Sequence, residues 1–177
     1  MPDIRTLAAS FMDNWRRTAH RITKYNPDNR DETGAYKVDE WTSISDIGKD
    51  LNGKRVTYAD YISIEDKYIL AIQTFCDYFD IKELEIKNLE THNSKAWDKD
   101  SLDLKGAYEK LRDNKSVSGT DIHSLARLIL REYLWCDLER NEKGIHFGYD
   151  YYMYFDIGTR MQEELKVKIQ DIGLYVE

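Results

Sequence analysis

The stretch Ile145 to Asp156 constrains the fold more than any other part of the chain, because its residues alternate between two kinds. An alternation with a period of two is what a β-strand imposes on its side chains. We therefore expect one half-buried strand over this range. Its core-facing set is Phe147, Tyr149, Tyr151, Met153 and Phe155. Its outward set, which we expect to meet water or a partner, is His146, Asp150, Tyr152, Tyr154 and Asp156.

The segment Leu134 to Arg140 alternates in the same way and predicts a second strand. The residues Asn141 to Gly144 between the two strands are typical of a hairpin turn. Pairing Arg140 with Ile145 keeps the apolar faces together, whereas a slip of one residue would put charged side chains into the core. This register sets Leu138 opposite Phe147, Glu139 beside His146 and Trp135 beside Asp150, so it adds Trp135, Asp137 and Glu139 to the outward face.

Apolar residues at helical spacing and capping signals predict most of the other elements. An N-terminal helix is expected from the apolar stripe Ile4, Leu7, Phe11, Trp15, Ala19 and Ile22. Further helices are expected from Ser43 to Asn52, Ser63 to Asp80, Leu104 to Leu111, Ser118 to Tyr133 and Thr159 to Ile172. Strands are expected over Lys82 to Leu89 and Leu174 to Val176, and a surface loop over Thr91 to Asp103.

This order of elements is typical of an α+β fold. We expect a single domain with a small, mainly antiparallel sheet, whose C-terminal hairpin packs against several helices while the other face stays at least partly exposed. The polar loop around Pro27 separates an N-terminal helix and linker, residues 1–30, from an α+β domain, residues 31–177.

The charge of the chain favours a basic partner. Its 177 residues include 33 Asp and Glu against 26 Lys and Arg, which gives a net charge of −7. This balance argues against nucleic acids and anionic membranes as partners. Neither a signal-peptide pattern nor a long apolar run occurs, and Cys76 and Cys136 each lie in an apolar pattern, so we expect a cytoplasmic protein with free thiols.

Sequence motifs for metal binding or catalysis are absent. The histidines (His20, His92, His123 and His146) lack HxxxH and HExxH spacing, so neither a metal nor a cofactor is expected. No GxSxG, P-loop or GxGxxG pattern occurs either. Two alternatives stay open. One is a small enzyme that uses His146 with Asp137, Glu139 or Asp150 in a cleft. The other is a regulatory binding module whose N-terminal helix docks a nucleic acid or an acidic partner through Arg16, Arg17 and Arg21.

Several short segments between Trp41 and Asp156 resemble small bacterial immunity proteins of contact-dependent inhibition and related polymorphic toxin systems. They are Glu40-Trp41-Thr-Ser-Ile-Ser-Asp-Ile-Gly48, Tyr61 and Glu65 ahead of Tyr68-Ile-Leu-Ala-Ile72, Leu89-Glu90, Leu130-Arg-Glu-Tyr-Leu-Trp-Cys136, and His146-Phe-Gly-Tyr-Asp-Tyr-Tyr-Met-Tyr154. The resemblance implies a non-enzymatic protein that binds one cognate toxin domain, often a nuclease. It transfers no individual binding residue.

The leading hypothesis is therefore an immunity protein that neutralises a basic toxin by charge-steered binding. Tyrosine and tryptophan provide large rigid contact area, and carboxylates among them complement lysine and arginine. The expected contact face consists of Trp135, Asp137, Glu139, His146, Asp150, Tyr152, Tyr154 and Asp156. The oligomeric state does not follow from the sequence.

Overall fold

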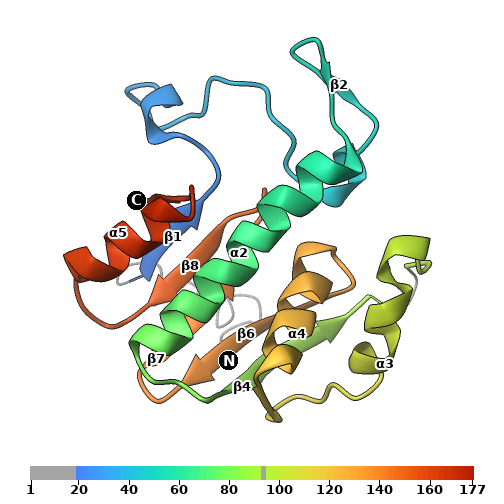
Figure 1. The fold of residues 1–177 in the computed structure, drawn as a ribbon, viewed down its shortest axis with the longest axis vertical. Coiled ribbons are helices and arrows are strands. Elements are labelled where there is room, and N and C mark those ends of the chain that lie inside the picture. Colours follow the sequence, from blue (N-terminus) through green and yellow to red (C-terminus); the bar gives the residue numbers. More distant parts are fainter. Residues whose placement is uncertain (1–18, 93–94) are drawn as a thin grey trace, which may run out of the picture.

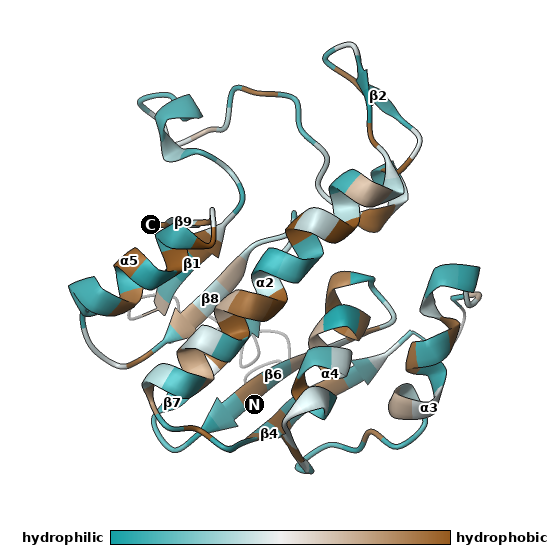
Figure 2. Ribbon diagram, in the orientation of Figure 1, coloured by the Kyte–Doolittle hydropathy of each residue, from teal (hydrophilic) through white to brown (hydrophobic). Residues whose placement is uncertain are grey.

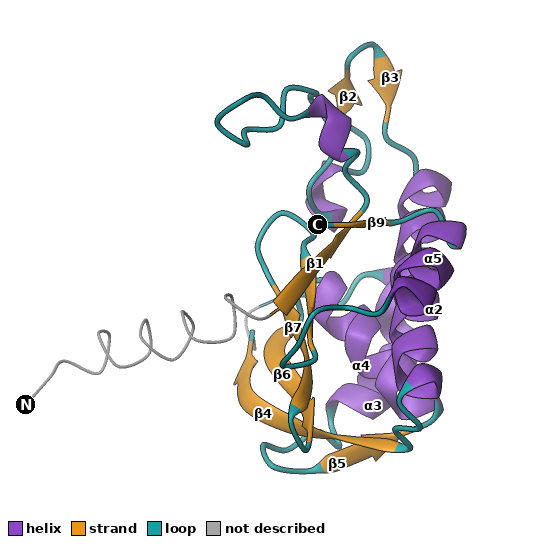
Figure 3. Ribbon diagram, turned by 90° about the vertical axis from the view of Figure 1, so that its left-hand side faces the viewer, coloured by secondary structure: helices purple, strands orange, loops and turns teal. Residues whose placement is uncertain are grey.

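The computed structural model describes residues 19–92 and 95–177. Its centre is a seven-stranded sheet with the strand order β5-β4-β6-β7-β8-β1-β9, in which all neighbours are antiparallel. The described α-helices cover one face of this sheet, as Figure 1 and Figure 3 show from two sides. The expected α+β fold in a single domain is confirmed.

The strands of the main sheet are β1 (Ala19–Thr23), β4 (Glu83–Thr91), β5 (Ser116–Ser118), β6 (Leu134–Arg140), β7 (Lys143–Phe147), β8 (Met153–Asp156) and β9 (Tyr175–Val176). A small hairpin pairs β2 (Asp50–Leu51) with β3 (Lys54–Arg55). The α-helices are α2 (Tyr58–Tyr78), α3 (Lys105–Tyr108), α4 (Thr120–Leu130) and α5 (Glu163–Asp171). Three short 3₁₀ helices are η1 (Pro27–Asn29), η2 (Ile44–Asp46) and η3 (Lys99–Leu104).

The core lies between the sheet and the helices. On α2, Tyr61, Tyr68 and Phe75 follow one another at intervals of two helical turns, so they share one face, and each is 0% exposed. Phe75 meets Phe155 of β8 at a ring centroid distance of 4.5 Å. Figure 2 shows the hydrophobic residues of α2 and α4 together with those of the strands that they cover. Burial of this layer is what attaches the helices to the sheet.

The single strand predicted over 145–156 is wrong, because the chain reverses at residues 148–152 and forms β7 and β8 instead. Asp150 and Tyr151 have φ angles of 56° and 66°, and the N–H of Gly148 donates to the carbonyl of Tyr152 at 2.8 Å. Phe147 pairs with Met153 across this turn, so both still face the core. The loop between Phe147 and Met153 has five residues, an odd number, so core-facing and outward-facing positions keep the same alternation in β7 and in β8. The sequence of this hairpin therefore has the same pattern as one continuous strand.

The predicted pairing of β6 with β7 is also wrong, by two residues. Leu138 pairs with Ile145, and the chain turns tightly at Asn141, whose φ of 55° asparagine tolerates well. Because the shift is even, the apolar faces still coincide. The expected neighbours change, however: Glu139 lies opposite Gly144 rather than beside His146.

The N-terminal helix was expected to continue through Ala19 and Ile22, but this end of it is a strand. Within β1, Ile22 pairs with Met153 and is fully buried. Because β1 lies between β8 and β9, it is an inner strand of the main sheet. The rest of the predicted helix, residues 1–18, lies outside the described residues.

The helices lie near their predicted positions, but several of them begin at other residues than the sequence predicts. The Ser43 and Asp46 capping box is confirmed, but it caps only η2, and the expected stop at Asn52 is the turn of the β2–β3 hairpin. The long helix α2 begins at Tyr58 with Thr57 as its N-cap, and the capping box of Thr57 with Asp60 lies ahead of the predicted start at Ser63. Strand β5 was not predicted, and α4 has Gly119 as its N-cap without a side-chain hydrogen bond.

Candidate functional site

The structure divides the predicted contact residues between two places. Trp135, Asp150 and Tyr152 line a cavity at one end of the sheet. Asp137, Glu139, His146, Tyr154 and Asp156 alternate with core residues and therefore lie on the sheet face opposite the described α-helices. Most residues of this second group are half-buried, and His146 is only 4% exposed.

Asp137 of β6 and His146 of β7 interact with each other across the two strands. The Nδ1 atom of His146 lies 2.8 Å from Oδ1 of Asp137, and the amide of Asn88 donates to the other carboxylate oxygen at 2.9 Å. The ring of His146 lies over Gly144, where a Cβ would come within 2.7 Å of Nε2. This packing requires a glycine at 144. Asp137 and His146 therefore stabilise the pairing of β6 with β7. Asp137, rather than the expected Glu139, is the acidic neighbour of His146.

Tyr152 is likewise engaged inside the molecule. Its hydroxyl accepts a hydrogen bond from Nη2 of Arg30 at 3.0 Å, and the guanidinium of Arg21 lies 4.9 Å from its ring centre. Glu177 joins the two arginines, with 2.7 Å to the Nε atom of each. Burial by itself would raise the pKa of Glu177, but the hydrogen bonds from Arg30 and Arg21 outweigh it and lower the pKa. Tyr152 thus anchors the segment around Arg30 to the sheet.

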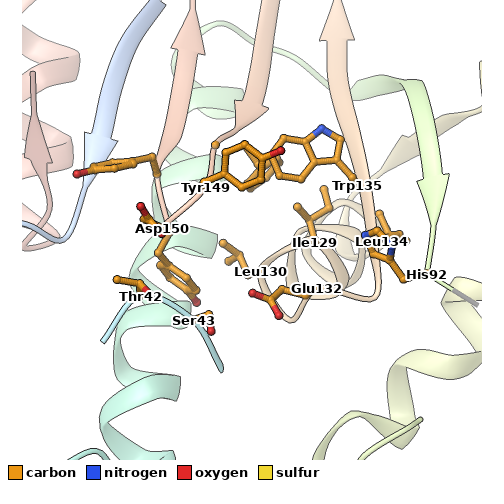
Figure 4. Close-up of a pocket in the computed structure, with 14 residues that line it drawn as sticks. Thr42, Ser43, His92, Ile129, Leu130, Glu132, Leu134, Trp135, Tyr149 and Asp150 are labelled. Carbon is orange, nitrogen blue, oxygen red and sulfur yellow. The ribbon is translucent and has the colours of Figure 1, made fainter. Parts of the chain in front are cut away.

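The cavity, here called the end cavity, has a volume of about 510 Å³ and lies where β6 begins, β7 ends and α4 stops (Figure 4). Trp135 and Tyr149 lie along one side, with ring centroids 5.9 Å apart. Ile129 and Leu130 of α4 supply apolar surface within it. The full lining is Thr42, Ser43, His92, Ile129, Leu130, Glu132, Leu134, Trp135, Phe147, Gly148, Tyr149, Asp150, Tyr151 and Tyr152.

The rim of the end cavity is acidic and aromatic. Glu132 and Asp150 are both exposed, and no lysine or arginine is among the described lining residues. Tyr149 was expected in the core, but it lies in the 148–152 turn and is 78% exposed. Tyr149 and the half-buried Trp135 together give this rim a contiguous aromatic surface, which is more informative than a single exposed apolar side chain.

Two residues of the end cavity have a backbone conformation that their side chains disfavour. Among the described non-glycine residues with positive φ, most are Asn or Asp, and the exceptions are Glu132 and Tyr151, with φ angles of 61° and 66°. The left-handed region costs an ordinary L-residue roughly 1–2 kcal/mol. Strain of this kind is often kept where the side chain has a function.

The surrounding structure explains how each strained residue is held. Glu132 occupies the position after α4 that glycine usually takes in a Schellman motif: its N–H donates to Ile129, and the N–H of Tyr133 donates to Leu128, both at 2.9 Å. Tyr151 accepts a hydrogen bond on its carbonyl from the hydroxyl of Tyr68 at 2.7 Å. Its ring lies in the core, where burial raises its pKa well above the ordinary value.

A buried ion pair fixes the end of α4 beneath the end cavity. Arg131 donates two hydrogen bonds to the carboxylate of Glu65 on α2, at 2.7 and 2.8 Å, and a third to the carbonyl of Asp100 at 2.7 Å. Arg127 also bonds to Glu65. Glu65 is 0% exposed and Arg131 is 4% exposed. Leu130 and Glu132, on either side of Arg131, are therefore held next to a buried and hydrogen-bonded guanidinium.

Sequence reasoning missed the α4 side of the site. Ile129, Leu130 and Glu132 lie within the predicted helix Ser118 to Tyr133, and none of them is among the expected contact residues. One available signal was the end of the predicted helix, where no Gly or Asn supplied the usual C-terminal cap. Thr42 and Ser43 also line the end cavity, and no pattern in the sequence around them predicts this contact.

Comparison of the chain with protein-family models, with curated proteins and with solved structures found no match. Across residues 19–92 and 95–177, no group of three or more His, Cys, Asp or Glu side chains is arranged to hold a metal ion. None of the helices that the structure describes combines the length and the apolar character needed to cross a lipid bilayer.

Proposed function

We propose that this protein is an immunity protein that binds and neutralises a basic toxin domain, with the rim of the end cavity at the centre of the contact surface. The observation that carries the proposal is the exposure of Tyr149 next to Trp135, on a cavity whose lining also includes the exposed residues Glu132 and Asp150. Aromatic anchors beside a hollow are typical of the residues that dominate binding energy at protein interfaces.

The contact face changes from the one expected from the sequence. Trp135 and Asp150 stay in it, and Tyr149 and Glu132 join it. Asp137, His146 and Tyr152 leave it as contact residues, because their polar atoms are engaged inside the molecule. Glu139, Tyr154 and Asp156 belong to the adjoining sheet face, which we assign to the margin of the same interface.

Binding suits this arrangement better than catalysis does. Acid–base chemistry needs a titrating group that substrate can reach, whereas His146 is only 4% exposed and rests on Asp137 and Gly144. The net charge of −7 favours encounter with a basic toxin. In this role the protein acts in the cytoplasm, where the toxin would reach its target.

The test is protection of cells from a toxin encoded beside this protein, together with the affinity of the purified pair. We expect wild-type protein to protect, and Tyr149→Ala to weaken binding about thirtyfold, which corresponds to roughly 2 kcal/mol. Asp150→Lys should weaken it further by repelling basic groups. Matched controls are Val167→Ala and Asp171→Lys on α5, where both residues are exposed. Equal loss in the controls, or no loss at Tyr149, would refute the site, and failure of wild-type protein to protect would refute the role.

A further inference from the structure

We infer that the end cavity is a socket for one arginine side chain carried by the partner. The inference rests on the proposed function and deepens it, because it names the group that is recognised. It follows from the chemistry of the cavity walls and from the charge at its rim.

The walls suit a flat cation at the end of an apolar stem. Trp135 and Tyr149 form an aromatic side, and their rings are tilted by 36° with centroids 5.9 Å apart. A guanidinium stacks on such rings more readily than an ammonium does, since it is planar and more weakly hydrated. Ile129 and Leu130 offer apolar surface to the methylene groups of the same side chain.

The rim supplies the opposite charge from two separate elements. Glu132 follows α4, whereas Asp150 lies in the turn between β7 and β8. In Figure 4 the two side chains lie apart, Asp150 beside Tyr149 and Glu132 near Leu130, so the two carboxylates reach the cavity from different directions. Neither carboxylate forms a salt bridge with another described residue.

Lys95, a cation that interacts with Glu132, has other partners outside the cavity. Lys95 interacts electrostatically with Glu132, but its ammonium donates to the carbonyl of Arg131 and lies 4.7 Å from the ring centre of Tyr133. It does not line the cavity. An acidic anchor would be repelled by the rim. A purely apolar anchor would leave the two carboxylates without a role in recognition.

The probe for this socket is N-acetyl-arginine amide, with N-acetyl-norleucine amide as an uncharged analogue of similar length. Each is titrated up to its solubility limit against the full chain labelled with ¹⁵N, and the indole N–H signal of Trp135 is followed. The signal is assigned from its loss in Trp135→Phe. We expect saturable shifts with the arginine probe and none, or far weaker ones, with norleucine.

Charge removal without change of shape completes the test. The double variant Glu132→Gln, Asp150→Asn should bind the arginine probe about three- to tenfold more weakly, whereas the control Asp80→Asn, Asp171→Asn should bind it normally. Equal binding of both probes, no binding of arginine, or unchanged affinity in the double variant would each overturn the socket. The toxin-protection assay is independent: protection without arginine binding removes the socket alone, and arginine binding without protection removes the immunity role alone.

Discussion

A single residue, Glu132, has a backbone conformation that costs stability. It occupies the left-handed position after α4, where glycine or asparagine relieves the strain that a glutamate maintains. Its side chain is exposed on the rim of the end cavity, so packing does not explain the choice of residue. The proposed role of its carboxylate in binding would explain it.

Replacing Glu132 should therefore stabilise the fold. We expect Glu132→Asn to raise the free energy of unfolding by about 0.5–1 kcal/mol, because asparagine tolerates a positive φ. Urea unfolding measures this change. Glu132→Gln is the matched control, since it removes the charge but keeps the strain, and its stability should match wild type within about 0.5 kcal/mol. An asparagine variant no more stable than the glutamine variant would contradict the explanation.

The two cysteines should be chemically inert in the folded protein. Cys76 is 5% exposed and Cys136 is 0% exposed, and burial raises the pKa of Cys76 to about 11 and that of Cys136 further still. The thiolate is the reactive form, so little of it exists at neutral pH. Reaction with a thiol-specific disulfide reagent should be slow in the native state and fast for both thiols in denaturant. A fast-reacting thiol without denaturant would show that its surroundings open.

At the scale of elements, the buried pair of Glu65 and Arg131 joins α2 to the end of α4 and to η3. Removing Arg131 leaves the buried carboxylate of Glu65 with Arg127 as its remaining cationic partner, so the charge is only partly compensated. We expect Arg131→Met to lower the free energy of unfolding by about 2–4 kcal/mol, measured by urea denaturation. Adding Glu65→Leu should recover part of the loss, because the partly compensated buried charge is then gone. Additive losses in the double variant would show that the two residues act independently.

The N-terminus of α2 provides a prediction about pH. Hydrogen bonds from Thr57, and then the charge and hydrogen bond of Lys54, lower the pKa of Asp60 to about 2 from an ordinary 3.8. A carboxyl with a depressed pKa stabilises the fold fully above its unfolded pKa, and this contribution is lost as the pH falls toward the folded value. Asp60→Asn should therefore be less stable than wild type at pH 6, and the difference should shrink as the pH falls from about 4 toward 2. Urea unfolding over the range in which both proteins stay folded tests this, and a difference independent of pH would contradict it.

Elements were predictable where one local pattern had one interpretation. The alternation in Leu134 to Arg140 gave β6 with its bounds, and that in 82–89 gave most of β4. Where two capping signals lie close together, the local sequence does not decide between them. Both Thr57 with Asp60 and Ser63 with Asp66 fit a helix start, and α2 begins after the first pair. The hairpin at 148–152 escaped because its loop preserves the alternation of the strands that it joins.

At the scale of the whole molecule, the end cavity depends on contacts that no local pattern contains. Residues 42–43, 92, 129–135 and 147–152 meet there only because the sheet and α4 are assembled. Trp135 and Asp150, which line the cavity, were among the contact residues expected from the sequence, although the register that placed them side by side was wrong. The acidic character of the end cavity could be predicted from the composition alone. The net charge of −7 means that carboxylates outnumber basic groups, so acidic surface is expected.

This global charge gives the last prediction, which concerns the rate of association with the proposed toxin partner. Charges that face a partner act over about one Debye length, roughly 10 Å at 0.1 M salt, so they mainly accelerate encounter. We expect the association rate constant to fall steeply as the salt concentration rises, and Asp150→Lys to lower it at low salt while leaving the rate at high salt almost unchanged. The matched variant Asp171→Lys changes the net charge equally but lies on α5, so it should have a much smaller effect. Stopped-flow mixing at several salt concentrations separates the two variants. Equal effects of both would mean that only the total charge steers the partner, and then the end cavity would not be the surface that the toxin approaches.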